Sequence, residues 1–223
     1  MAKLWLLRHG ESEWNLQNRF TGWTDVGLSD RGKAEALEAG EQLKNVKLDT
    51  LYTSVLSRAI DTAKLALGAS GHGFDSLPRF EDQALNERHY GDLQGLNKAE
   101  IGKQYGQEQL HKWRRSYDVQ PPNGESLKDT KDRVMPYWET KILPDLKAGK
   151  HLLISAHGNS IRALVMVLSD FTPEVIPSIE IPTGYAFSYT VQPDGSATCD
   201  VNIRELNGVV KKMREEKAAK LSS

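Results

Sequence analysis

Cysteine is nearly absent from this sequence, and long apolar runs are absent altogether. Cys199 is the only cysteine in 223 residues, so no intrachain disulfide can form, as is usual in a reducing compartment. No apolar run approaches the ~18 residues of a membrane-spanning helix. The run at residues 4–7 is too short for a secretory signal. We therefore expect a cytoplasmic protein that does not enter a membrane.

The sequence also lacks an excess of charge of one sign. Its 29 basic and 30 acidic residues give a formal net charge of −1. No overall positive field therefore favours nucleic acid or an anionic membrane as a partner. Any site for an anion must be built from a local cluster of cations.

The common phosphate-binding loops are missing as well. The glycine-containing stretch 68–73 does not match GxGxxG, and GxxxxGK[ST] occurs nowhere in the chain. A nucleotide-dependent kinase is therefore poorly supported, and we interpret 68–73 as an ordinary loop.

What the chain does contain is an alternation of strand-length apolar runs and helical patterns. The predicted strands are 4–7, 48–53 and 151–156, with a hairpin over 185–203. The predicted helices are 29–46, 54–67, 98–118, 125–146 and 160–169. Ser29 and Ser54 are candidate N-caps, and Pro136 is expected to kink the helix that ends near Pro144.

This alternation predicts an α/β fold with three layers, α/β/α. The central sheet is expected to be mostly parallel, with helices on both faces and the C-terminal hairpin as an antiparallel edge. We expect residues 1–205 to form a single catalytic domain. Residues 206–223 form a polar tail that could move and could act as a lid over the site.

Two apolar runs each end in a His-Gly pair. LWLLRHG places His9 after the first strand, and LLISAHG places His157 after another. In parallel sheets, ligands bind beyond the carboxyl ends of the strands, and a glycine there would let the backbone approach a ligand closely. The two histidines could therefore converge in one cleft. A single histidine at a strand end is more often structural, but a matched pair makes that interpretation weaker.

Metal binding and phosphoryl transfer are the two chemical interpretations of this pair. Zinc normally takes three or four ligands, and the chain has neither a cysteine partner nor HExxH spacing, so we expect no metal. A neutral imidazole, by contrast, can carry a phosphoryl group covalently. Arg8 precedes the first histidine and Arg58 lies early in a helix near a strand end, where guanidinium groups would suit phosphate oxygens.

The segment LLRHGESEWNLQNRFTGWTDVGLSDRG resembles the opening of the histidine phosphatase superfamily. LNERHYG, GLNKAE and WRRSYD together resemble its branch of cofactor-dependent phosphoglycerate mutases. The resemblance covers most of residues 3–170 and thins towards the C-terminus. It implies interconversion of 3-phosphoglycerate and 2-phosphoglycerate in glycolysis and gluconeogenesis. It also implies small phosphorylated three-carbon acids as ligands, 2,3-bisphosphoglycerate as the cofactor that primes the enzyme, and no metal.

The resemblance also assigns roles to residues. His9 would be the phosphorylated nucleophile, with Arg8, Arg58 and His157 around the phosphoryl group. Glu87 would exchange a proton with the substrate hydroxyl, a role that calls for a raised pKa. The residues that would hold the rest of the ligand are Gly10, Ser12, Asn15, Thr21, Gly22, Arg88, Tyr90, Lys98, Arg114, Arg115, Gly158 and Asn159.

Three functions remain open from the sequence. A mutase must retain a doubly phosphorylated intermediate, and Arg114 and Arg115 supply cations for that. A phosphatase of another small phosphate or phosphoprotein needs only one phosphate site. A non-catalytic module that binds anions or phosphopeptides is the third. Longer family members carry an insertion between Pro122 and Gly124 that this chain lacks, so an oligomer is possible but not predicted.

Overall fold

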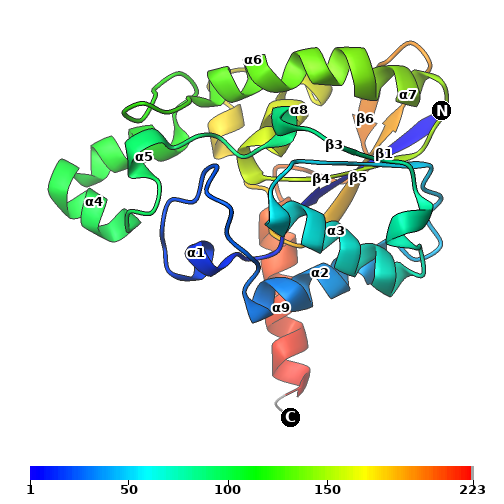
Figure 1. Cartoon of the computed structure of the whole chain (residues 1–223), viewed down its shortest axis with the longest axis horizontal. Helices are drawn as coiled ribbons and strands as arrows, with labels where there is room; N and C mark the ends of the chain where they lie inside the picture. The colour runs from blue at the N-terminus through cyan, green and yellow to red at the C-terminus, as the bar shows by residue number, and fades with distance from the viewer. Residues whose placement is uncertain (222–223) are drawn as a thin grey trace.

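A six-stranded sheet forms the centre of the computed structural model, which describes residues 1–221 (Figure 1). The strands are β1 (Ala2–Arg8), β2 (Thr50–Thr53), β3 (Arg79–Glu81), β4 (Leu152–Ala156), β5 (Ala186–Val191) and β6 (Ala197–Cys199). Their order across the sheet is β3-β2-β4-β1-β5-β6. The first four are mutually parallel, β5 is antiparallel to β1, and β6 is antiparallel to β5. The predicted fold class and the C-terminal hairpin are confirmed.

Helices cover both faces of this sheet. One face carries α2 (Asp30–Gln42) and α3 (Ser57–Ser70), and the other carries α6 (Leu127–Tyr137), α7 (Leu143–Lys147) and α8 (Gly158–Leu168). Strand β1 shows why its sequence is a continuous apolar run. Leu4 and Leu6 pack towards α6 and α8, whereas Leu7 packs towards α2 and α3. A strand buried on both faces needs apolar side chains at successive positions.

Two serines predicted as caps behave differently. Ser29 caps α2, because its Oγ accepts a hydrogen bond from the backbone N–H of Gly32 at 3.1 Å. The prediction for Ser54 is wrong: α3 begins at Ser57, with Leu56 as the N-cap residue. The Ser54 hydroxyl instead accepts from the Leu56 N–H and forms a hydrogen bond with the ring of His157.

The single helix predicted over 98–118 is two helices. Gly106 has a φ of +85°, a conformation that interrupts the helix between α4 (Lys98–Tyr105) and α5 (Gln107–Arg115). The two helices pack over their own small apolar cluster, which includes Phe20 and Trp113. Figure 1 shows this helical pair standing beside the sheet rather than on either face. We refer to α4 and α5 as the helical cap.

The segment 125–146 is also less regular than predicted. After α6 the chain forms a π-helical stretch, Trp138–Ile142, before α7. Pro136 lies inside α6, two residues before this stretch, and Pro144 lies in the first turn of α7 rather than at a helix end. The helical backbone continues from the π-helical stretch into α7, because the N–H of Leu143 donates to the carbonyl of Trp138.

The polar tail forms a helix, α9 (Leu206–Leu221), and residues 222–223 lie outside the described part. Arg214 of α9 pairs with Glu35 of α2 at 3.1 Å, and Lys217 pairs with Glu38. In Figure 1 the helix projects beyond α2. The separation of a mobile tail from a domain ending at residue 205 stays a prediction.

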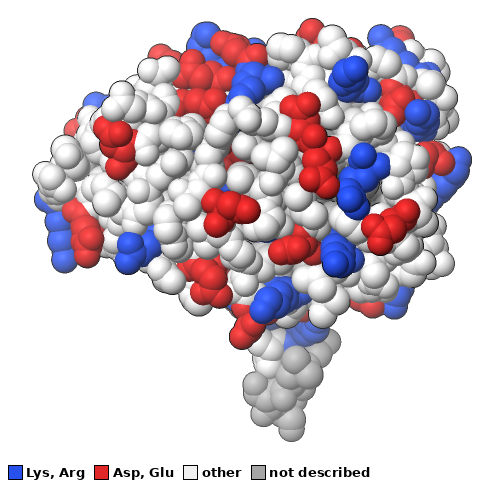
Figure 2. All heavy atoms as spheres, viewed as in Figure 1, with Lys and Arg blue, Asp and Glu red and all other residues white. Residues whose placement is uncertain are grey.

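The remaining elements are short. They are the helix α1 (Glu13–Leu16) and the 3₁₀ turns Phe74–Ser76, Gln83–Leu85, Gly91–Leu93 and Ile176–Ser178. No helix within residues 1–221 combines the length and apolar character needed to cross a membrane. Basic and acidic side chains are interspersed over the face shown in Figure 2, as the near-zero net charge predicts.

Candidate active site

The two His-Gly pairs meet just beyond the carboxyl ends of two neighbouring strands in the middle of the sheet. Strands β1 and β4 are parallel neighbours whose last residues, Arg8 and Ala156, are in register. The N–H of His9 donates to the carbonyl of Ala156 at 3.0 Å. This register brings the rings of His9 and His157 to a centroid distance of 5.0 Å. The predicted convergence is therefore present in the structure.

The ring of His9 is held in one tautomer. Its Nδ1 lies 2.6 Å from the carbonyl oxygen of Gly10. Because a carbonyl can only accept, Nδ1 carries the hydrogen, and Nε2 keeps its lone pair. Burial, reinforced by the charges of Arg58 and Arg8, lowers the pKa of His9 well below its usual value. The imidazole is therefore neutral near pH 7, and Nε2 is a candidate nucleophile.

His157 is a second neutral imidazole beside His9. Its Nε2 lies 2.7 Å from the hydroxyl of Ser54, and its side chain is fully buried. Burial and the nearby Arg58 lower the pKa of His157 well below its usual value. Ser54 fixes the ring orientation, a function that the sequence did not reveal.

Two buried arginines lie beside the histidines. Arg58 donates to the carbonyls of Gly22 and Thr24 at 2.7 and 3.0 Å, and Arg8 donates to the carbonyl of Ile181 at 2.7 Å. Within residues 1–221 neither guanidinium forms a direct ion pair with a carboxylate. Burial lowers the pKa of Arg58 to about 10, so the group remains charged at neutral pH. Buried cations without a direct ion pair are costly, and a bound anion would offset that cost.

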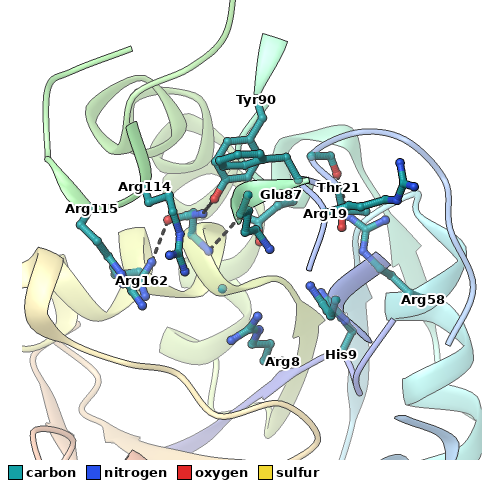
Figure 3. Close-up of a pocket in the computed structure, with 16 residues that line it drawn as sticks. Arg8, His9, Arg19, Thr21, Arg58, Glu87, Tyr90, Arg114, Arg115 and Arg162 are labelled. Carbon is teal, nitrogen blue, oxygen red and sulfur yellow. Dashed lines mark hydrogen bonds between the residues drawn. The ribbon is translucent and has the colours of Figure 1, made fainter. Parts of the chain in front are cut away.

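These groups line a cavity of about 130 Å³ (Figure 3). Its lining residues are Arg8, His9, Asn15, Arg19, Phe20, Thr21, Gly22, Arg58, Glu87, Tyr90, Lys98, Arg114, Arg115, Gly158, Asn159 and Arg162. Seven of these carry a Lys or Arg charge, against the single carboxylate of Glu87. The cavity therefore suits a small molecule with several negative charges.

Glu87 is a buried residue of the cavity lining. Its Oε1 accepts hydrogen bonds from the backbone N–H groups of Arg88 and Asn159, at 2.8 and 3.0 Å. Burial raises its pKa, but the charge of Arg8 and these hydrogen bonds outweigh burial, and the pKa lies below its usual value. The raised pKa expected from the sequence is therefore wrong for the protein without ligand, because folding places cations and N–H donors around this carboxylate.

The far side of the cavity is formed by the helical cap. Lys98, at the start of α4, has its ammonium 5.6 Å from the ring centre of Phe20. Burial lowers the pKa of Lys98 to about 8. Arg114 and Arg115 extend from the end of α5, and Figure 3 shows them across the cavity from His9.

A family model described as "Histidine phosphatase superfamily (branch 1)" matches residues 4–203. The chain belongs to this superfamily. A relative from Rhodopseudomonas palustris is 50% identical over 202 residues, which cover 90% of this chain and 97% of the relative. One from Methylocella silvestris is 53% identical over 193 residues, covering 86% and 93% of the two chains. Both bear the name 2,3-bisphosphoglycerate-dependent phosphoglycerate mutase, and the chain belongs to that family.

Solved structures of the superfamily share the fold at lower identity. A mycobacterial glucosyl-3-phosphoglycerate phosphatase, solved with VO3, has a TM-score of 0.78 at 26% identity, covering 91% of this chain and 99% of its own. A protein titled "Bacillus stearothermophilus YhfR" has a TM-score of 0.77 at 28% identity, covering 91% and 96%.

Four of the predicted site residues of this histidine phosphatase chain do not line the cavity: Gly10, Ser12, Arg88 and His157. Ser12 caps the short helix α1. Arg88 donates to the hydroxyl of Tyr90 at 3.1 Å and to the carbonyl of Arg114 at 2.8 Å, so it supports two residues that do line the cavity. Direct ligand contacts by these four residues stay predictions.

The two glycines after the histidines have different partners. A Cβ at Gly10 would lie 2.1 Å from the carbonyl oxygen of Gly32, so the close approach there is to helix α2 and not to a ligand. A Cβ at Gly158 would lie 3.4 Å from the guanidinium of Arg8. The expectation that glycine opens the backbone to a ligand is therefore wrong for Gly10. At Gly158 the nearest group is the side chain of Arg8, at ordinary van der Waals distance from such a Cβ.

Sequence reasoning missed Arg162, Arg19 and Phe20 in the lining. Arg162 is 7% exposed and donates to the carbonyl of Ile179 at 2.8 Å and to Oδ1 of Asn159 at 2.7 Å. It lies four residues after Gly158 on α8, one helical turn along the same face. That spacing was the available signal.

His9, Glu87 and His157 also have the geometry of a metal site. One potential ligand atom from each lies within 4.8 Å of the others. Arg8 and Arg58 make the surroundings positive, which disfavours a divalent cation at this point. The expected absence of a metal stays a prediction.

Proposed function

We propose that this protein interconverts 3-phosphoglycerate and 2-phosphoglycerate in glycolysis and gluconeogenesis. Relatives that are about half identical over most of the chain bear the mutase name. The cavity is small and strongly cationic, as a short acid with two charged groups requires. One observation carries the proposal: a nucleophilic histidine lies at one side of the cavity, and a second group of cations lies at the other (Figure 3).

In the first half-reaction, phosphorylated His9 donates its phosphoryl group to the free hydroxyl of a monophosphoglycerate. The N–P bond at Nε2 breaks as the new O–P bond forms, and the hydroxyl proton passes to Glu87. Arg8 and Arg58 stabilise the charge on the moving group, the main catalytic contribution in phosphoryl transfer.

The second half-reaction reverses these steps with the other phosphate. The bound 2,3-bisphosphoglycerate reorients within the cavity, and its other phosphoryl group then passes back to His9. The departing oxygen recovers its proton from Glu87, so protons balance over the cycle. Lys98, Arg114 and Arg115 hold the intermediate while it turns, because a site with only one phosphate pocket would release it.

The proton transfer requires the pKa of Glu87 to change during the cycle. Arg8 and Arg58 contribute to keeping that pKa low, together with the hydrogen bonds to Oε1. Phosphoryl groups beside the arginines would neutralise their influence, so we propose that the pKa of Glu87 rises towards the range useful for an acid.

The enzyme needs a primer, because phosphohistidine can be lost to water. We propose that 2,3-bisphosphoglycerate supplies it by phosphorylating His9. The seven cations of the cavity fit a ligand with two phosphates and a carboxylate. A cytoplasmic location and the absence of a metal requirement are part of the same proposal.

A direct assay tests the mutase function. The protein is incubated with 3-phosphoglycerate, a trace of 2,3-bisphosphoglycerate and a chelator, and phosphorus NMR follows the products. We expect 2-phosphoglycerate to form, and to form only slowly when the primer is withheld. No 2-phosphoglycerate from the primed wild-type protein would refute the proposal.

A phosphatase is the second candidate, favoured by the likeness to a structure titled as a phosphatase. The same experiment separates the two functions. Rapid release of inorganic phosphate from many esters, with negligible isomerisation, would favour the phosphatase.

A further inference from the structure

A three-residue segment before β5 holds three arginines of the cavity. The carbonyl of Ile179 accepts from Arg162, and the carbonyl of Ile181 accepts from Arg8. Between them, the side chain of Glu180 pairs with Arg115 at 2.8 Å. The side chains of Ile179 and Ile181 are themselves buried, each 2% exposed. The segment is therefore a fixed support for three guanidinium groups.

Glu180 makes two contacts with its two oxygens. Oε1 accepts from Nη2 of Arg115 at 2.8 Å, and Oε2 accepts from the side-chain amide of Asn207 on α9 at 2.7 Å. Within the described chain, Arg115 forms no hydrogen bond through Nε or Nη1. Asn207 binds one oxygen of the Glu180 carboxylate, and Nη2 of Arg115 binds the other. The Nε and Nη1 donors of Arg115 therefore stay available to a ligand in the cavity that it lines.

Arg115 and Arg162 differ in how firmly the protein holds their side chains. Arg162 is buried and tied to two acceptors, whereas the Arg115 side chain is 29% exposed and lies at the end of α5. Their charges repel: burial, reinforced by the charge of Arg115, lowers the pKa of Arg162 to about 10. Figure 3 shows Arg115 extending towards Arg162 despite this repulsion. Glu180 is the carboxylate that pairs with Arg115 there.

We propose that Glu180 is a positioning residue, which holds Arg115 against the cavity so that the doubly phosphorylated intermediate is retained. This inference rests on the proposed mutase function. Asn207 strengthens the arrangement by fixing the carboxylate, and so connects α9 to the ligand-retaining side of the site. Glu180 makes no contact with the reacting atoms, so its effect passes through Arg115.

The test measures ligand retention separately from turnover. Calorimetry gives the Kd of 2,3-bisphosphoglycerate on a His9→Ala background, which cannot be phosphorylated, for Glu180→Ala and Glu180→Gln. The Glu180 side chain is 49% exposed, so solvent screens the pair. We expect Glu180→Ala to raise Kd about fivefold and Glu180→Gln, which keeps an acceptor for Arg115, to raise it about twofold. Glu81→Ala is the matched control, since Glu81 pairs with Arg79 at 2.9 Å on β3 and is similarly exposed.

A double-mutant cycle shows whether the effect passes through Arg115. In the Arg115→Ala background, Glu180→Ala should change Kd by less than about twofold, because no guanidinium remains to position. In active enzyme, Glu180→Ala should raise KM and the phosphatase share while kcat changes little.

Three results would overturn the inference. Tighter binding by Glu180→Ala would mean that the carboxylate competes with the ligand for Arg115. An unchanged Kd, or an equal loss with and without Arg115, would remove the positioning role. Failure of the proposed function is recognised separately, as a wild-type protein that makes no 2-phosphoglycerate.

Discussion

The two sides of the active-site cavity are built in different ways. The reacting side, with His9, His157 and Arg58, stands on strand ends and a sheet-packed helix, and each of these residues is at most 3% exposed. The ligand-retaining side comes from the helical cap, which has its own small apolar cluster. Its cations reach the cavity from helix ends, and the Arg115 side chain is 29% exposed.

This difference separates the chemistry from ligand retention. Under the proposed mechanism, the nucleophile at the end of a central strand should keep its geometry when the helical cap is altered. Changes to the cations of the cap should then leave the phosphohistidine step intact. We expect mutations on the reacting side to act on kcat and mutations on the cap to act on KM and on the fate of the intermediate.

Replacing the nucleophile should have the largest effect. His9→Ala leaves no acceptor for the phosphoryl group, and we expect mutase activity to fall by at least about 10⁴-fold. Acid-labile labelling by 2,3-bisphosphoglycerate should disappear as well. His111→Ala, which removes an exposed histidine of α5, is the control. A labelled His9→Ala protein would place the nucleophile at another residue.

Glu87→Gln should have the next largest effect. The amide oxygen can still accept from the backbone N–H groups of Arg88 and Asn159, so the fold is retained, but the proton can no longer be exchanged. We expect kcat to fall by about 10²–10⁴-fold with little change in Kd for 2,3-bisphosphoglycerate. Rapid-quench measurement of phosphoryl transfer checks this, and an unchanged transfer rate would assign the proton step to another group.

Removing the cationic side chains of the helical cap should have a smaller effect, on KM rather than on kcat. Arg114→Ala or Arg115→Ala removes charged hydrogen bonds to the ligand, and we expect KM to rise about 10–100-fold. The share of bound intermediate lost as inorganic phosphate should rise with it, as measured by phosphate release per 2-phosphoglycerate formed. If kcat for phosphoryl transfer fell instead, the two sides of the cavity would not be separable.

The pH dependence should show the smallest effect. The pKa of Lys98 is lowered to about 8, so its charge is lost as pH rises through that value. Because the anionic ligand favours the charged form, we expect KM to increase several-fold between pH 7 and 9. The low pKa of His9 predicts no matching loss of nucleophile between pH 7 and 6. Lys98→Arg should flatten the alkaline change, and a wild-type slope that persists in this variant would exclude Lys98 as its origin.

The sequence was most informative where the relevant contacts are local. Continuous apolar runs identified β1 and β4, and the His-Gly pair after each run indicated the strand ends beside which the cavity lies. The prediction of one helix over 98–118 was wrong, because Gly106 interrupts it between α4 and α5. The π-helical stretch after Pro136 carries no comparable local signal.

Periodicity and short motifs are local signals, and they were enough to predict the fold class, the main strands and helices, and a candidate set of reacting groups. Which groups meet depends on the packed structure. Ser54 and His157 are 103 residues apart, and Arg115 and Glu180 are 65 residues apart. The low pKa of Glu87 arises in the same way, from arginines that folding brings around it. Charges and hydrogen bonds act between groups that are close in space, so their effects can be predicted only once the neighbours in the folded protein are known.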